Sequence, residues 1–206
     1  MNLASYWPFN LPDSKQQIIQ MEASQNPNVW FGLTHRYTKD NGGLKLEDYG
    51  ANGWIDAWKL KLVNGEVIEW ADEFPTYTSV FATGKELWWG GNLEIGQEVT
   101  RSLEIASGVA SPYKWGTEVL KLEALHNTFT IPAGSFSNVV QVKMFQSFCK
   151  TNACTWPDGQ NTWITRHWLA SNVGIIQTEY LSVPGTPVFN PPRIDYATNI
   201  VITWKT

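Results

Sequence analysis

The chain carries little charge and no long hydrophobic run. Charged residues make up 17% of its 206 residues, and the formal net charge is −4. A mildly acidic chain without a basic run has no electrostatic reason to bind nucleic acid or an anionic membrane surface. No segment approaches the roughly 20 consecutive apolar residues that cross a bilayer as a helix. We therefore expect a protein that neither spans a membrane nor binds nucleic acid.

The sequence also lacks the short motifs of several enzyme classes. It contains no Gly-x-Ser-x-Gly, no phosphate-binding loop and no Gly-x-Gly-x-x-Gly, which leaves serine hydrolases and nucleotide-binding proteins without support. The three histidines, His35, His126 and His167, fall on separate predicted strands with no second histidine nearby. We expect ordinary polar roles for them rather than a metal site, and no cofactor is implied.

Cysteine is scarce, and its spacing bears on the compartment. Cys149 and Cys154 bracket a segment that is polar in its middle and aromatic at its ends, as in the tip of a hairpin. Their spacing is not the Cys-x-x-Cys of redox and zinc sites. A disulfide here would close a short loop, contribute about 2 kcal/mol and persist only in an oxidising compartment. We predict this disulfide, with two neighbouring free thiols as the alternative.

The beginning of the chain is not a signal peptide. Met1–Tyr6 has neither a basic region nor an apolar stretch behind it. The chain is then either cytosolic or the mature part of an exported protein with a new Met1. The predicted disulfide favours the second possibility, and we expect a secreted, periplasmic or cell-surface location.

Strand patterns separated by turns recur along the chain, and helix signals are few. Asn64-Gly65 between two strand patterns is the strongest hairpin signal, because both central residues of a type I′ turn need positive φ. A short capped helix is expected over 15–22, and the proline-rich stretch 182–192 should be extended. The predicted strands cover 29–37, 54–63, 66–70, 76–83, 86–89, 97–105, 118–126, 138–148, 162–170, 174–181 and 198–204.

These patterns predict one all-β domain over residues 1–206. We expect a curved antiparallel sheet that forms a β-sandwich or an open, barrel-like domain, with at most one or two short helices.

Two motifs of the second half carry a resemblance. Thr130–Phe136 contains a Pro-Ala-Gly-x-Phe turn followed by a strand, and Trp168–Ile176 is an aromatic strand that continues into Val-Gly-Ile-Ile. This pattern resembles a broad group of uncharacterised bacterial secreted proteins and lipoproteins, and Tyr6–Phe9 is similar to the aromatic-proline entry of that group. The chain departs from the pattern at Ser171-Asn172, where Pro-Gly is usual, and it adds the cysteine hairpin. The resemblance implies a curved antiparallel sheet and export from the cell, and it transfers no catalytic residue.

Tryptophan is the most unusual part of the composition, with 12 residues. Most of these rings should be core, because each has a large apolar area to bury. Neighbouring residues of a strand point to opposite faces, so we expect one ring of Trp88-Trp89 to be core and the other to be exposed or in a groove. Trp54, Trp58, Trp88 and Trp89 are therefore the candidate ligand-binding residues, with scattered exposed rings as the alternative.

The hairpin at Asn64-Gly65 also suggests a catalytic possibility. A two-residue turn should pair Leu60 with Glu69, Trp58 with Ala71 and Asp56 with Glu73. One face would then combine the carboxylates of Asp56, Glu69 and Glu73 with the rings of Trp54 and Trp58, as a glycan-cleaving site requires. These acids at the rim of a core face are the alternative, and a slip of one residue in the register removes the arrangement.

Three functions follow from these patterns. The first is a secreted, non-catalytic β domain that binds an extended or amphipathic ligand, such as a carbohydrate, through exposed tryptophans. The second is a glycan-active enzyme that uses Asp56, Glu69 and Glu73. The third is a structural or assembly protein of a cell surface or particle. The oligomeric state cannot be read from the sequence.

Overall fold

The computed structural model describes residues 1–23, 34–50, 52–108, 114–151, 162–182 and 193–205. These residues form thirteen β-strands and one short 3₁₀ helix, η1 (Leu3–Tyr6). The strands are β1 (Lys15–Ala23), β2 (Thr34–Asp40), β3 (Gly43–Gly50), β4 (Gly53–Val63), β5 (Glu66–Phe74), β6 (Tyr77–Phe81), β7 (Leu87–Gly90), β8 (Glu98–Ser107), β9 (Trp115–Ile131), β10 (Gly134–Cys149), β11 (Thr162–Ala170), β12 (Gly174–Ser182) and β13 (Arg193–Trp204).

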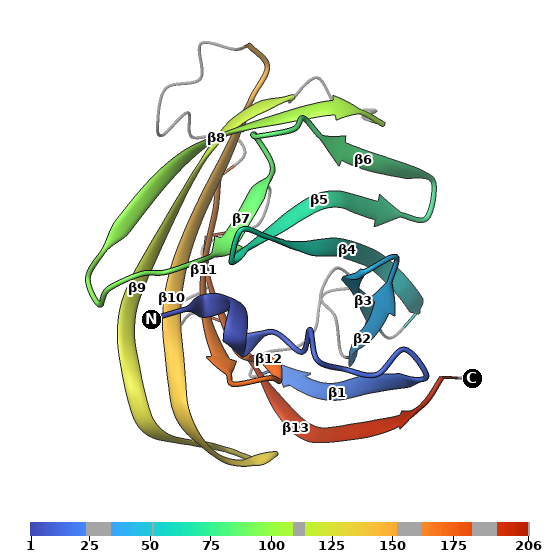
Figure 1. Cartoon of the computed structure of the whole chain (residues 1–206), viewed down its shortest axis with the longest axis vertical. Coiled ribbons are helices and arrows are strands. Elements are labelled where there is room, and N and C mark those ends of the chain that lie inside the picture. Colours follow the sequence, from blue (N-terminus) through green and yellow to red (C-terminus); the bar gives the residue numbers. More distant parts are fainter. Residues whose placement is uncertain (24–33, 51, 109–113, 152–161, 183–192, 206) are drawn as a thin grey trace.

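All thirteen strands belong to one antiparallel sheet that closes on itself. The order runs β4-β3-β2-β1-β13-β12-β11-β10-β9-β8-β6-β5, and the β4–β5 pairing joins the two ends (Figure 1). β7 pairs with residues 67–69 of β5, outside this ring of twelve strands. The fold is therefore a closed barrel. The β-sandwich alternative is wrong, because the β4–β5 hairpin pairs with β3 on one side and β6 on the other.

The turn chemistry read from the sequence is confirmed. Asn64 and Gly65 have φ values of 52° and 81° and connect β4 to β5. Pro132 and Ala133 form the two-residue connection between β9 and β10, where Ile131 pairs with Gly134. In both cases the turn residues fix which strands become neighbours.

The helix expected over residues 15–22 is wrong, since these residues form β1. Gln17, Ile19 and Met21 are buried with exposed fractions of 2%, 0% and 6%, which is the two-residue period of a strand. β1 is hydrogen-bonded to β2 on one edge and to β13 on the other. Tertiary pairing on both edges outweighs the local helix signal of Pro12-Asp13-Ser14.

The structure adds one strand that the sequence did not predict, and two predicted segments lie partly outside the described residues. β3 was not predicted, although Leu44, Leu46 and Asp48 alternate inward along it. The extended stretch expected over 182–192 lies outside the described residues apart from Ser182, and so does the part of the first predicted strand before Thr34.

The N-terminal segment closes one end of the barrel, and Figure 1 shows η1 within the outline of the ring. The Leu3 N–H donates to the Gly91 carbonyl at 2.8 Å, and the Asn172 N–H donates to the Ser5 carbonyl at 3.0 Å. Trp7 is 1% exposed and packs edge-on against Trp89, with 5.2 Å between ring centroids. Residues 1–11 therefore close the end of the barrel whose interior is lined by apolar side chains.

Gly174, in the resemblance motif, is packed against Tyr37. A Cβ atom on Gly174 would lie 2.5 Å from the Tyr37 hydroxyl oxygen, and the Ile175 N–H donates to that oxygen at 3.2 Å. Tyr37 is fully buried and cannot move aside. Glycine within a strand commonly marks such a close approach to the backbone.

We predict that Gly174→Ala lowers the free energy of unfolding by about 3 kcal/mol, because it adds a core clash to the strain of positive φ. Gly84→Ala is the matched control: Gly84 has φ +80° against +90° for Gly174, and its Cβ would meet no atom within 4 Å. It should cost about 1 kcal/mol. Urea denaturation measures both, and equal losses for the two variants would contradict the packing argument.

Candidate functional site

The inward rows of side chains turn from apolar to polar toward one end of the barrel. Leu44 and Leu46 are followed by Asp48 on β3, and Leu169 is preceded by His167 and Thr165 on β11. The same change occurs on other strands, and cross-strand pairing brings these positions together, as in His35 with Asp48 and Asp48 with Asp56. We call this region the polar end; it is lined by His35, Asp48, Asp56, Asp72, Glu118, Thr165, His167, Thr178, Tyr180, Arg193 and Asp195.

A histidine–carboxylate pair lies on β2 and β3. His35 Nδ1 is 2.9 Å from Asp48 Oδ1, and His35 is 7% exposed. Burial lowers the pKa of His35, but the charge of Asp48 and its hydrogen bond outweigh this effect, and the net pKa is raised. The raised pKa favours the protonated form of His35 next to Asp48.

The second cation of the polar end is Arg193. Its Nε and NH2 groups donate to the two carboxylate oxygens of Asp195 at 2.8 and 2.9 Å, and both residues are buried. The guanidinium also lies over the ring of Tyr180, 5.7 Å from its centroid. A two-pronged pair of this kind holds a buried charge in a fixed orientation.

Trp89 separates the polar end from the apolar half. Its ring stacks on Trp58 with 5.0 Å between centroids and meets His167 edge-on at 5.3 Å. Its indole N–H donates to Glu69 at 2.9 Å. His167 bonds to the hydroxyls of Thr165 and Thr178, and burial lowers its pKa to about 3, so it is neutral.

Two buried glutamates hold the strand β7 in place. Glu69 is 2% exposed and Glu118 is 1% exposed, and Glu118 accepts the Trp88 backbone N–H at 2.7 Å. Burial raises the pKa of each to about 8, against the opposing effect of these hydrogen bonds. Both side chains are therefore mainly protonated at neutral pH.

Apart from the His35–Asp48 pair, six buried side-chain polar atoms have no hydrogen-bond partner in the described part of the chain. Three are the indole nitrogens of Trp7, Trp88 and Trp168, and the other three, Trp54 Nε1, Asp56 Oδ1 and Asp72 Oδ1, belong to β4 and β5. Trp54 and Asp56 lie two residues apart on β4, and Asp72 pairs with Trp58, two residues further along. Burial raises the pKa of Asp56 and of Asp72 well above the usual range, and the nearby acidic side chains raise them further.

A ligand could satisfy these groups, since a buried polar atom without a partner costs about 1–3 kcal/mol. Protonated carboxyl groups both donate and accept hydrogen bonds, and the indole N–H donates. The three groups therefore suit a ligand with neighbouring donors and acceptors.

The structure divides the three predicted catalytic acids between two faces. Asp56 and Glu69 point inward, whereas Glu73 forms ion pairs with Lys45 at 2.9 Å and Lys59 at 2.6 Å on the outer face. The expected pairs Trp58–Ala71 and Asp56–Glu73 are wrong, because a β-bulge between Lys59 and Leu60 shifts the register by one residue. Asp72 takes the inward position assigned to Glu73.

The four candidate tryptophans all lie on or against the interior. Trp88 and Trp89 are 2% and 4% exposed, so the expectation that one of them is exposed is wrong. β7 pairs with β5 in addition to the twelve ring strands, and Arg101 covers Trp88 at 4.2 Å from the ring centroid. Trp54 and Trp58 are half-buried; Trp58 stacks on Trp89, whereas Trp54 pairs with Tyr49 beyond a register shift in β4. Their role as ligand contacts stays a prediction.

The remaining predictions concern the three histidines and the cysteine pair. His35 and His167 are both interior, whereas His126 bonds to Gln141 at 2.9 Å outside the polar end. In the described ranges, no group of three or more His, Cys, Asp and Glu residues is placed to hold a metal ion. Cys149 ends β10 and is 2% exposed. Cys154 lies outside the described residues, so the disulfide stays a prediction.

Comparisons with known proteins identify no family. No family model matches the chain, and no curated protein matches it. Two solved structures are similar over 95% of this chain and 98% of their own. One, at 11% identity and a TM-score of 0.47, is described as a "putative lipoprotein" from Parabacteroides distasonis. The other, at 12% identity and a TM-score of 0.43, is described as a "putative exported protein with YmcC-like fold" from Bacteroides fragilis.

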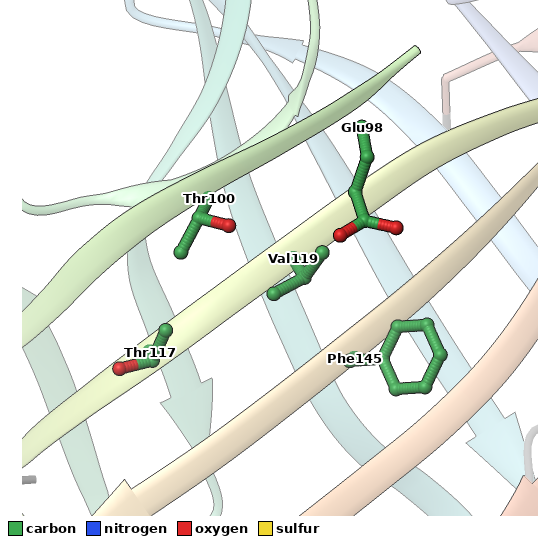
Figure 2. Close-up of a pocket in the computed structure, with 5 residues that line it drawn as sticks. All are labelled: Glu98, Thr100, Thr117, Val119 and Phe145. Atoms are coloured by element: carbon green, nitrogen blue, oxygen red, sulfur yellow. The ribbon is translucent and has the colours of Figure 1, made fainter. Parts of the chain in front are cut away.

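The described part of the chain contains no helix with the length and hydropathy that a membrane crossing requires. The outer wall carries a surface depression of about 250 Å³, shown in Figure 2. It is lined by Glu98, Thr100, Thr117, Val119 and Phe145 of β8, β9 and β10. Thr100, Val119 and Phe145 form one row across these strands. These side chains offer no concentration of polar groups comparable with the polar end.

The polar end includes residues that the sequence reading missed, namely Asp48, Asp72, Arg193 and Asp195. A signal for three of them was available. Leu44-x-Leu46-x-Asp48 and Arg193-x-Asp195-x-Ala197 are alternating rows in which charged residues occupy positions of the buried face. Asp72 could not be placed, because its orientation depends on the bulge.

We predict that the raised pKa of Glu118 makes the barrel less stable as pH rises. Its folded pKa of about 8 exceeds the unfolded value, so the free energy of unfolding falls between about pH 4.5 and pH 8. Glu118→Gln removes this titration and keeps an acceptor for the Trp88 N–H. The loss of stability between pH 5 and pH 8 should shrink by at least about 1 kcal/mol in urea denaturation.

Glu118→Leu serves as the comparison, because it removes both the titration and the acceptor. This variant should be destabilised at every pH. An unchanged pH dependence in Glu118→Gln would show that Glu118 is already ionised in the fold at neutral pH.

Proposed function

We propose that the chain is an exported, non-catalytic β domain that binds a neutral polyhydroxyl ligand of the carbohydrate class at its polar end. The binding groups are Trp54, Asp56 and Asp72, with Trp58 behind them. The observation that carries the proposal is the set of three buried polar atoms without partners, Trp54 Nε1, Asp56 Oδ1 and Asp72 Oδ1.

The raised pKa values of the acids favour a neutral ligand. Burial and neighbouring acids raise the pKa of Asp56 and Asp72, and Glu69 with a pKa of about 8 interacts with both. Neutral carboxyl groups attract a cation weakly, but they exchange hydrogen bonds readily with hydroxyl groups. Sugar hydroxyls both donate and accept, which matches what these groups lack.

The aromatic rings beside these acids fit the same class of ligand. Trp58 lies two residues from Asp56 on β4 and stacks on Trp89, and Trp54 lies two residues from Asp56 in the other direction, across a register shift. A binding site of a few polar groups bordered by aromatic rings fixes the orientation of a ligand through the polar groups and its affinity through the apolar contact. Trp88 and Trp89 support this wall from the core and do not contact the ligand in our proposal.

The enzymatic alternative receives less support from the geometry. Glu69 is almost fully buried and bonded to Trp89, and Glu73 lies on the outer face. Catalysis by the three acids together requires them to reach one substrate, so we propose binding without turnover.

The binding proposal is tested by isothermal titration with neutral oligosaccharides of glucose and of N-acetylglucosamine, and with a cationic glucosamine oligomer. At least one neutral oligosaccharide should bind, and more tightly than the cationic oligomer. Asp56→Asn should change the Kd by less than about fivefold, because it stays neutral and polar, whereas Asp56→Leu should weaken binding at least about tenfold.

Glu73→Gln is the control, since Glu73 lies on the opposite face of the same sheet, and it should leave the Kd unchanged. The proposal fails if no neutral oligosaccharide binds, if the cationic oligomer binds best, or if Asp56→Leu binds like the unchanged protein.

Export is tested by counting thiols. We predict no reactive thiol in the denatured, unreduced protein purified from its natural host, and two after reduction, because Cys149 and Cys154 are joined. Denaturation is needed because Cys149 is 2% exposed. Two thiols before reduction would contradict the disulfide and remove the main argument for an oxidising compartment.

A further inference from the structure

The last part of β13 is paired on one edge only. Its residues from Asn199 to Trp204 pair with β1, whereas its pairing with β12 ends at Tyr196. The Ala197 carbonyl accepts the Ala133 N–H at 3.1 Å. Beyond that bond, no strand in the described ranges pairs with the second edge of residues 198–204. We call this segment the β13 edge.

The β13 edge is apolar and exposed. Val201, Ile202 and Trp204 have exposed fractions of 38%, 60% and 67%. Edge strands are normally protected against pairing by charged side chains or proline. Residues 198–204 contain neither. The Lys15 ammonium lies 3.3 Å from the ring centroid of Trp204, next to β1.

We propose that the β13 edge pairs antiparallel with the same edge of a second copy of this chain, forming a two-fold homodimer. Strand addition satisfies the open backbone groups, and a two-fold axis presents the same edge from both copies. The axis passes through Ile202, so that Ile202 faces Ile202 of the second copy and Ile200 faces Trp204. The side chains of residues 200, 202 and 204 then form one continuous apolar row across the dimer.

The proposed register is self-complementary and opposes no like charges, which suits a second copy as the occupant. In this register Val201 faces Thr203 and Lys205 faces Asn199, so no like charges oppose each other. Each copy carries a net charge of −4, and contact through an uncharged edge keeps that charge away from the interface. A register centred on Val201 would still pair Ile200 with Ile202, but it would place Trp204 opposite Thr198.

Sedimentation equilibrium of the full chain over a wide concentration range tests the dimer. The unchanged protein should dimerise reversibly, and Ile202→Lys should weaken the dimer at least about tenfold, because two buried ammonium groups would face each other. Ile95→Lys is the matched control: Ile95 is 59% exposed but lies outside the strands, and its substitution should have no effect. The melting temperature of each variant monitors folding.

The register is tested by oxidative cross-linking of Ile202→Cys. Two copies should join through residue 202, whereas Ile95→Cys should not cross-link. A protein that stays monomeric at every concentration, as expected if the edge receives a strand of another protein, would overturn the proposal. A dimer that Ile202→Lys does not weaken would overturn it too.

Discussion

The closure of the barrel by the β4–β5 pairing decides the chemistry of the interior. Once this pairing joins the two ends of the sheet, inward side chains lose contact with water and contact one another instead. Buried carboxyl groups then keep their protons or find a cation, because an isolated charge is costly away from water. Asp48 and Asp195 have His35 and Arg193 as partners, whereas Asp56 and Asp72 share a region rich in other acids. Closure therefore creates both the ordered ion pairs and the unpaired polar groups.

The interior is built from two different halves. The apolar half is filled by the N-terminal segment through Trp7, and Trp89 forms the boundary through its contacts with Trp58, His167 and Glu69. Aromatic rings with a polar handle suit this boundary, since they pack against the core and still bond to a buried acid. The ligand that we propose would form hydrogen bonds with the Trp54, Asp56 and Asp72 atoms that have no partner in the described part of the chain.

Local signals predicted the hairpins, and long-range pairing decided the rest. Asn64-Gly65 and Pro132-Ala133 specify their turns by backbone conformation, so the sequence predicts these turns. The first pairs of the β4–β5 hairpin, including Leu60 with Glu69, were also correct. The bulge opposite Lys59 was not predicted. It places Asp72, and not Glu73, at the inward position of the candidate site. The local sequence of β1 predicts a helix, because its strand conformation depends on pairing with β2 and β13, which lie elsewhere in the sequence.

The central claim is that Asp56 and Asp72 are neutral groups poised for hydrogen bonding rather than a charged site. The most direct measurement is a carbon-13 NMR titration of the aspartate carboxyl carbons, assigned with Asp56→Asn and Asp72→Asn. The account predicts that both carboxyl groups are still protonated at pH 7, because burial and their acidic neighbours raise each pKa. Carboxylate shifts for both residues at pH 5 and above would contradict it.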